Sequence, residues 1–460
     1  MLTVEKIGGT SMTAFGDVVK NIISHKRTGK ELYNRIFIVS AYAGVTNWLL
    51  EDKKTGAPGI YHHFINQKDF RKSLDELDAK LKEMNKKYVE LGLNLKEADE
   101  FIEKRINDAE RYLVSLGDVL ASGYVSRENI FQAAREILAS IGESHSAFNS
   151  VNILNNKGIN AVFVDLSGFH DSEPLTIDQR IASSLNGIDF ANNVTIVTGY
   201  TKGTEGIMRE FDRGYSEVTF SKVAVAVKAD EAIIHKEYHL SSADPNIVGV
   251  DNVVPVGYTN YDVADQLADV GMEAIHPKAS KPLEINGINL RIKNTFEPDH
   301  PGTLITKNYV GEHKRVEVIT GTDKVVIIDV HDPLMVGEVG FDLKLMQDFA
   351  DFGISYICKA TSANSISVVV WEKDFKQALQ ERLQSKYQTV ETRKVAIVCL
   401  IGTNIDQPGV LGKAAVSLGE NNINILAVSH SLRQVNIQFI IERDKFKDAI
   451  RVLNGNIYFK

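Results

Sequence analysis

The 460-residue sequence has only two cysteines, Cys358 and Cys399, and they lack the spacing of metal ligands or of a disulfide framework. Each lies in an apolar run that is typical of a strand. We therefore predict two buried structural thiols and a reducing compartment.

Positive charge is also in short supply. The chain has 52 Lys and Arg residues against 60 Asp and Glu residues, a formal net charge of -8. This balance excludes a broad electrostatic footprint for nucleic acid or an anionic membrane, so any phosphate site has to be local. No apolar run approaches the length of a bilayer span, and the strand-like start at Leu2 follows no basic segment or apolar signal core. We expect a cytoplasmic protein without nucleic-acid or membrane partners.

What is present is the composition of a globular enzyme, 43% hydrophobic and 24% charged, in a chain long enough for two to four domains.

The amino terminus carries the first functional pattern. An apolar run at residues 2–4 leads through Lys6 into Gly8-Gly9-Thr10-Ser11, before a helical pattern that we expect to start near Phe15. Two glycines let backbone N–H groups approach an anion, and Lys6 adds a full positive charge. The pattern favours a nucleotide phosphate, although it is not a P-loop and a plain tight turn stays open.

Residues 1 to about 305 alternate strand-like runs with amphipathic helical stretches, which predicts an α/β architecture with a largely parallel sheet. Between about 66 and 135 the pattern changes to charged helices, so we predict a helical insertion there with solvated faces. The clearest strand-like runs are residues 35–39, 161–164, 194–197 and 232–234.

The carboxy-terminal third contains an internal repeat of about seventy residues. Residues 325–330 are echoed by 395–400, and residues 365–370 by 435–440. Each unit reads strand, helix, strand, strand, helix. The pair resembles a tandem of ACT regulatory domains, which bind a small amino acid; a pair used only for dimerisation is the alternative.

Three further clusters carry polar groups. Residues 40–47 follow a strand, and their Ser40 and Thr46 hydroxyls are expected at the sheet edge beside the glycine turn. Residues 140–143 are expected to open a helix with Glu143 in its first turn. Residues 212–217 combine a cation, a glycine, a hydroxyl and a carboxylate, for which an exposed ion pair is the alternative.

In this order, the clusters resemble the aspartate kinases of the amino-acid kinase family over essentially the whole chain. Residues 6–11 are similar to the family's Lys-Phe-Gly-Gly-Thr-Ser, and residues 40–47 to its Ser-Ala-x-x-Gly-x-Thr-Asn. Residues 140–143 fit Ser-x-Gly-Glu, residues 213–217 correspond to Arg-Gly-Gly-Ser-Asp, and Asp244-Pro245 to the Asp-Pro of the nucleotide loop.

The chain departs from the family where Glu217 replaces Asp, Tyr215 replaces Gly and Glu273 replaces Lys, so its nucleotide site is atypical. It resembles the divergent monofunctional branch that is associated with ectoine biosynthesis, in residues 5–12 and 239–245.

The resemblance implies a three-layer αβα amino-acid kinase fold over residues 1–305, with the helical insertion at about 66–135. Two α+β ACT-like domains would follow at residues 316–390 and 391–460. It also implies a homodimer or a higher homo-oligomer.

The implied activity is phosphorylation of the L-aspartate side chain by ATP and Mg²⁺ to 4-phospho-L-aspartate, a first step toward lysine, threonine, methionine or ectoine. By resemblance, Lys6 neutralises the moving phosphoryl group and Glu217 orients Lys6. Because Glu217 is one methylene longer than Asp, we expect a compensating contact nearby, or weak activity. No protein metal ligand is implied. The remaining implied roles are aspartate binding by Ser40, Thr46, Glu143, Arg213 and Ser216, and nucleotide binding by Lys6, Gly8, Gly9, Thr10, Ser11 and Asp244.

Regulation and two rival functions stay open. Residues 355–363 have no carboxylate for the amines of a lysine effector, so threonine, another product or no ligand is possible. One rival is an amino-acid kinase that acts on a different carboxylate. The other is a catalytically weak or silent relative that binds an amino acid, which the changes at Tyr215, Glu217 and Glu273 would suit.

Overall fold

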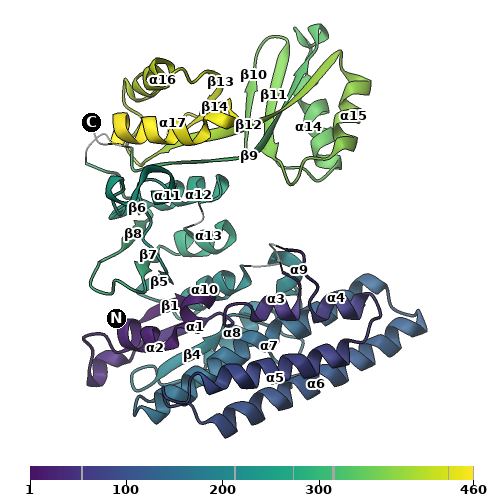
Figure 1. Ribbon diagram of the computed structural model, residues 1–460, viewed down its shortest axis with the longest axis vertical. Coiled ribbons are helices and arrows are strands. Elements are labelled where there is room, and N and C mark those ends of the chain that lie inside the picture. The colour runs from purple at the N-terminus through teal and green to yellow at the C-terminus, as the bar shows by residue number, and fades with distance from the viewer. Residues whose placement is uncertain (53–54, 212–213, 273, 313–315, 434, 459–460) are drawn as a thin grey trace. The chain divides into compact units, whose positions relative to one another are not determined.

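The chain folds into two compact units that alternate along the sequence. The first comprises Met1–His239 and His276–Gly302, and the second comprises Leu240–Ile275 and Thr303–Lys460. Residues 240–275 therefore pack with the carboxy-terminal third. A computed structural model (Figure 1) describes residues 1–52, 55–211, 214–272, 274–312, 316–433 and 435–458.

A parallel sheet lies at the centre of the first unit, with strands paired in the order β3, β4, β2, β1, β5, β7. β2 and β4 are buried at every position, as expected for strands covered on both faces. The four strands predicted from apolar runs are confirmed. The strands are β1 (Thr3–Ile7), β2 (Arg35–Val39), β3 (Ala161–Val164), β4 (Val194–Thr198), β5 (Glu231–Lys236) and β7 (Asn289–Asn294).

Helices cover both faces of this sheet. α10 (Tyr215–Ala226) packs on β1, β2 and β5, while α7 (Arg127–Asn156) packs on β2, β3 and β4. The long helices α5 (Phe70–Lys86) and α6 (Leu95–Ser122) lie along α7 (Figure 1). The other helices of this unit are α1 (Gly9–Thr13), α2 (Phe15–Val18), α3 (Val45–Leu49), α4 (Ile60–Ile65), α8 (Ile177–Leu185), α9 (Ile207–Phe211) and α13 (Pro277–Ile285).

One predicted helix start is confirmed and one is wrong. α2 begins at Phe15, as predicted, although the short α1 precedes it and starts at Gly9, directly after the glycine turn. Residues 140–143 do not open a helix but lie in the middle of α7, which is capped at Ser126 and continues without a break. Gly142 is required there for packing, since a Cβ would come within 2.8 Å of the Ala41 Cβ. This glycine brings α7 against the loop after β2.

The second unit contains one six-stranded antiparallel sheet in the order β10, β11, β9, β12, β14, β13. Each half follows the strand, helix, strand, strand, helix order that the repeat predicts. The elements are β9 (Val318–His331), α14 (Phe341–Asp351), β10 (Cys358–Thr361), β11 (Ser365–Trp371), α15 (Gln377–Lys386), β12 (Thr389–Ile401), α16 (Val410–Glu420), β13 (Ile425–His430), β14 (Asn436–Glu442) and α17 (Phe446–Leu453).

The four helices α14 to α17 share one face of that sheet, because alternate residues of β9 and β12 pack against them. The opposite face packs against Leu240, Val263 and Leu267 of the 240–275 segment. Cys358 and Cys399 are buried and free, as predicted. The 240–275 segment contributes α11 (Pro245–Val248), α12 (Tyr261–Asp269) and β6 (Tyr258–Asn260), which pairs with β8 (Thr303–Thr306).

No helix in the described parts of the chain combines the length and the apolar character that crossing a membrane requires.

Candidate active site

The glycine turn joins β1 to α1 at the carboxyl edge of the sheet. Gly8 is the extended N-cap residue of α1. Gly9 lies so close to the next loop that a Cβ would come within 2.7 Å of the Ala41 carbonyl oxygen. Only glycine therefore allows the turn to lie against residues 40–47. Thr10 is exposed, while the hydroxyl of the buried Ser11 donates to Glu237 Oε1 at 3.1 Å.

Lys6 and Glu217 form an ion pair at this edge. Lys6 Nζ lies 3.3 Å from Glu217 Oε1, and each side chain is about one-seventh exposed, at 14%. Glu217 Oε2 accepts a second hydrogen bond, at 2.7 Å, from the backbone N–H of His276. Although burial alone would raise the pKa of Glu217, the charge of Lys6 lowers it below its usual value. The carboxylate is thus ionised and held at both oxygens.

Glu143 is the second carboxylate of the site and is almost fully buried, with 2% exposed. Its Oε1 accepts a hydrogen bond of 2.6 Å from Ser216 Oγ, whereas its Oε2 accepts none from the described residues. Burial raises the pKa of Glu143 to about 8, against the lowering effects of Ser216, of the positive charge of Lys6 and of the backbone of Tyr200 and Ala41. A buried carboxylate oxygen without a donor is costly unless a ligand supplies one.

Gly199 makes room for this pair. A Cβ at Gly199 would come within 2.8 Å of Ser216 Cβ and 2.9 Å of Glu143 Oε2. Ser216 lies in the first turn of α10, whose N-cap Gly214 has a φ of 93° that favours glycine. Strand β4 and helix α10 therefore place a backbone wall and a hydroxyl directly against the Glu143 carboxylate.

Ser40 lies in the loop that Gly9 contacts, and Thr46 lies in the first turn of α3, directly after that loop. The backbone N–H of Ser40 donates to Ile7 O at 3.1 Å, which places Ser40 beside the end of β1. Both residues are partly exposed, and their hydroxyls bond to no other described residue. These hydroxyls are thus available to a ligand.

Tyr215, which stands where the family has glycine, does not point into solvent. It is 5% exposed, and its ring meets that of Tyr200 edge-on at 6.0 Å. Tyr200 is held in turn by Glu136, whose Oε2 accepts its hydroxyl hydrogen bond at 2.6 Å. The tyrosine that replaces the family's glycine is therefore accommodated by burial against Tyr200.

Two predicted residues need separate mention. Arg213 lies outside the described residues. Asp244 caps α11 in the second unit, where its side chain accepts from the N–H of Asn246. No group of three or more His, Cys, Asp and Glu in the described ranges is arranged to hold a metal ion.

The structure adds participants that the sequence reasoning missed: the Gly199 backbone, the His276 N–H and Glu237. Gly199 carried a usable signal, because it comes two residues after the predicted strand at 194–197. The His276 N–H carried none, because any residue presents a backbone N–H and only the fold decides where it lies.

Comparison with known proteins gives the family. The sequence profile of the amino acid kinase family matches residues 1–294, and an ACT domain profile matches residues 398–456. The chain belongs to the amino acid kinase family. The predicted resemblance and the predicted fold class are thereby confirmed.

Similar proteins in this family are aspartate kinases. The chain is 43% identical over 460 residues to aspartate kinase Ask_Ect of Stutzerimonas stutzeri (strain A1501), covering 99% of this chain and 97% of that protein. It is 24% identical over 511 residues to the aspartokinase of Candida albicans, covering 98% and 88%.

Solved structures share the fold. Clostridium acetobutylicum aspartate kinase superposes with a TM-score of 0.71 at 21% identity, covering 99% of both chains. Escherichia coli aspartokinase III in complex with aspartate and ADP superposes with a TM-score of 0.73 at 19% identity, covering 100% of both.

Proposed function

We propose that this protein is an aspartate kinase, which transfers the γ-phosphoryl group of ATP to the side-chain carboxylate of L-aspartate and forms 4-phospho-L-aspartate. The observation that carries the proposal is the buried Glu143 carboxylate, one oxygen of which accepts no hydrogen bond from the described part of the chain, near the ion-paired Lys6. An α-ammonium group would supply the missing donor and favour the charged form of Glu143. The site thus suits a free amino acid next to a phosphoryl-transfer lysine.

The reaction needs little acid–base catalysis. The attacking carboxylate is already ionised near neutral pH, so the protein has to hold two anions in line and neutralise charge in the transition state. We assign this charge to Lys6, with the backbone of Gly8 and Gly9 cradling the phosphates. Glu217 keeps Lys6 in place, and the N–H of His276 fixes the longer carboxylate.

The remaining assignments follow the family pattern. Glu143 takes the aspartate ammonium, Arg213 takes its α-carboxylate with Ser216 assisting, and Ser40 and Thr46 contact the reacting end. We assign nucleotide binding to Thr10, Ser11 and Asp244.

Mg²⁺ would supply further positive charge to the phosphates. The donor set fits an ion carried by the nucleotide, since the described residues form no acidic or histidine cage.

We also propose that free lysine is not the effector of the ACT-like pair. Lys359 Nζ already donates a hydrogen bond of 2.7 Å to the carboxylate of Asp342, which lies in the first turn of α14. Titrating lysine and threonine into the kinase reaction tests this, and inhibition by lysine would refute it. The similarity to Ask_Ect supports the ectoine-associated branch that the sequence predicts.

The experiment is an ATP- and Mg²⁺-dependent hydroxamate assay, in which hydroxylamine traps acyl phosphates, with aspartate, glutamate and N-acetylglutamate compared side by side. Selective product from aspartate supports the proposal. Product from another acid would move the function within the family, and no product with any acid would favour a silent amino-acid-binding relative.

A further inference from the structure

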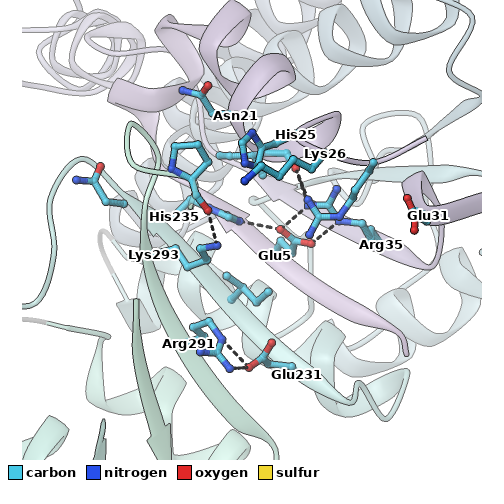
Figure 2. A pocket seen from close by; sticks show the side chains of 15 residues that line it. Glu5, Asn21, His25, Lys26, Glu31, Arg35, Glu231, His235, Arg291 and Lys293 are labelled. Carbon is cyan, nitrogen blue, oxygen red and sulfur yellow. Dashed lines mark hydrogen bonds and ion pairs between the residues drawn. The ribbon is translucent and has the colours of Figure 1, made fainter. Parts of the chain in front are cut away.

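A second polar pocket lies in the first unit, on the sheet face opposite to Lys6. Neighbouring residues of a strand point to opposite faces, so Glu5 faces this pocket while Lys6 faces Glu217. The pocket has a volume of about 430 Å³ and is lined by β1, β5, β7 and the segment from Asn21 to Arg35 (Figure 2). It is thus separate from the kinase residues.

Most charges around this pocket are paired. Arg35 Nε lies 2.6 Å from Glu5 Oε1, and Arg291 Nη2 lies 2.7 Å from Glu231 Oε1. Lys26 pairs with Asp299. Figure 2 shows the first two pairs among the lining side chains, with Arg291 and Glu231 below Glu5 and Arg35. These pairs leave no net charge.

Two cations are not paired with any described carboxylate. Arg27 donates to the carbonyl oxygen of Ile22 at 3.2 Å, and Lys293 Nζ donates to that of Pro298 at 3.1 Å. Both side chains are partly buried and line the pocket. Glu31, the remaining carboxylate of the lining, is exposed and caps its own short helix through the N–H of Thr28. The pocket lining therefore has an excess of positive charge, with five Lys and Arg side chains against three Glu side chains.

The surroundings lower the pKa of both cations. Burial lowers the pKa of Arg27 and the neighbouring Arg35 lowers it further, against the opposing effects of Glu5 and Glu31. Burial lowers the pKa of Lys293 too, followed by the positive charge of Arg27, against the opposing effects of Glu5 and Glu231. Arg27 and Lys293 thus repel each other, an arrangement that a bound anion would relieve.

We propose that this pocket binds a phosphate group, presented by inorganic phosphate or by a small phosphomonoester, between Arg27 and Lys293. A phosphate dianion matches two cations in charge, and its oxygens accept from a guanidinium fork and an ammonium at once. The volume suits a small metabolite. The proposal does not depend on the kinase function.

Titration calorimetry with inorganic phosphate, at constant ionic strength in chloride, tests the proposal on the full chain. Wild-type protein should bind, and Lys293→Met and Arg27→Gln should each weaken binding by about tenfold or more, the usual loss for one charge-assisted hydrogen bond. Lys30→Met removes an exposed lysine three residues from Arg27 and should bind as wild type. Circular dichroism checks that each variant is folded.

Because a kinase site also attracts phosphate, Lys6→Met is the decisive second control. Phosphate binding that survives Lys6→Met and is lost in Lys293→Met supports the pocket. Binding that is lost in Lys6→Met and kept in both pocket variants would overturn it, as would no binding at tens of millimolar phosphate. Glycerol 3-phosphate, titrated in parallel, distinguishes a phosphomonoester site from one for free phosphate.

Discussion

Two buried glutamates of the first unit, Glu5 and Glu143, are each 2% exposed and yet differ in every electrostatic respect. Glu5 accepts from Arg35 at 2.6 and 3.0 Å and is bonded to His235 at 2.7 Å. Although burial disfavours its charge, Arg35 and His235 hold the pKa of Glu5 well below its usual range. Glu143 has one hydroxyl donor, and burial raises its pKa to about 8.

The difference distinguishes a carboxylate that stabilises the fold from one that is suited to bind a ligand. The Glu5 network is complete within the chain, so it stabilises the fold and needs no ligand. The Glu143 carboxylate is incomplete, so its free energy improves when a cation arrives from outside. A buried acid whose donors are missing therefore marks a ligand site, whereas burial alone does not.

The largest expected effect is on folding. Glu5→Gln leaves Arg35 as a buried charge without its acid, which should lower the free energy of unfolding by about 3–5 kcal/mol. Urea unfolding of wild type and variant at pH 7 measures this. Glu143→Gln is the matched control: it replaces an equally buried acid that is mostly protonated at pH 7 and forms no ion pair with a described residue, so it should not destabilise. Equal losses in the two variants would refute the comparison.

The adjacent residue on β1 should affect catalysis instead. Lys6→Ala should reduce kcat by about 10²–10³, the usual effect of removing one preorganised donor, while the unfolding midpoint stays close to wild type. Steady-state kinetics and urea unfolding measure the two quantities. Lys20→Ala, at an exposed position of the same unit, is the control. Near-wild-type turnover of Lys6→Ala would remove Lys6 from the mechanism.

Glu143→Gln should weaken aspartate use by about 10–100-fold in kcat/KM, since an amide replaces a charged acceptor of the ammonium group. The KM for ATP should change little. The hydroxamate assay with varied aspartate measures this, and an unchanged aspartate dependence would show that the open carboxylate is not the amine site.

The smallest effect is the pH dependence. Because the pKa of Glu143 in the free protein is about 8, its ionised, ammonium-binding form increases as pH rises. We expect kcat/KM for aspartate to rise up to about tenfold per pH unit below pH 8 and then level off. The same raised pKa means that Glu143 reduces stability as pH rises from about 4.5 through 8, because the folded state binds the extra proton. A Glu143→Gln profile as steep as wild type would contradict this.

The local chemistry of the chain was predictable. Apolar runs at 35–39 and 194–197 form strands because branched residues suit a doubly covered sheet, and the seventy-residue repeat forms matching halves of one antiparallel sheet. The start of α7 was missed because Ser140 resembles an N-cap residue, while the true cap, Ser126, lies fourteen residues earlier. Capping residues are local signals that tertiary packing can override.

The sequence by itself determined which residue types stand at strand ends, and hence the family, Lys6 with its glycine turn, and Glu143 as a candidate. Only the tertiary structure decided that Glu217 is held by the His276 N–H and that Tyr215 packs on Tyr200. It also decided that one oxygen of Glu143 accepts no hydrogen bond from the described residues, whereas both oxygens of Glu5 accept from Arg35. The physical reason is that charge state depends on burial and on partners hundreds of residues away. Periodicity and motif spacing do not encode these quantities.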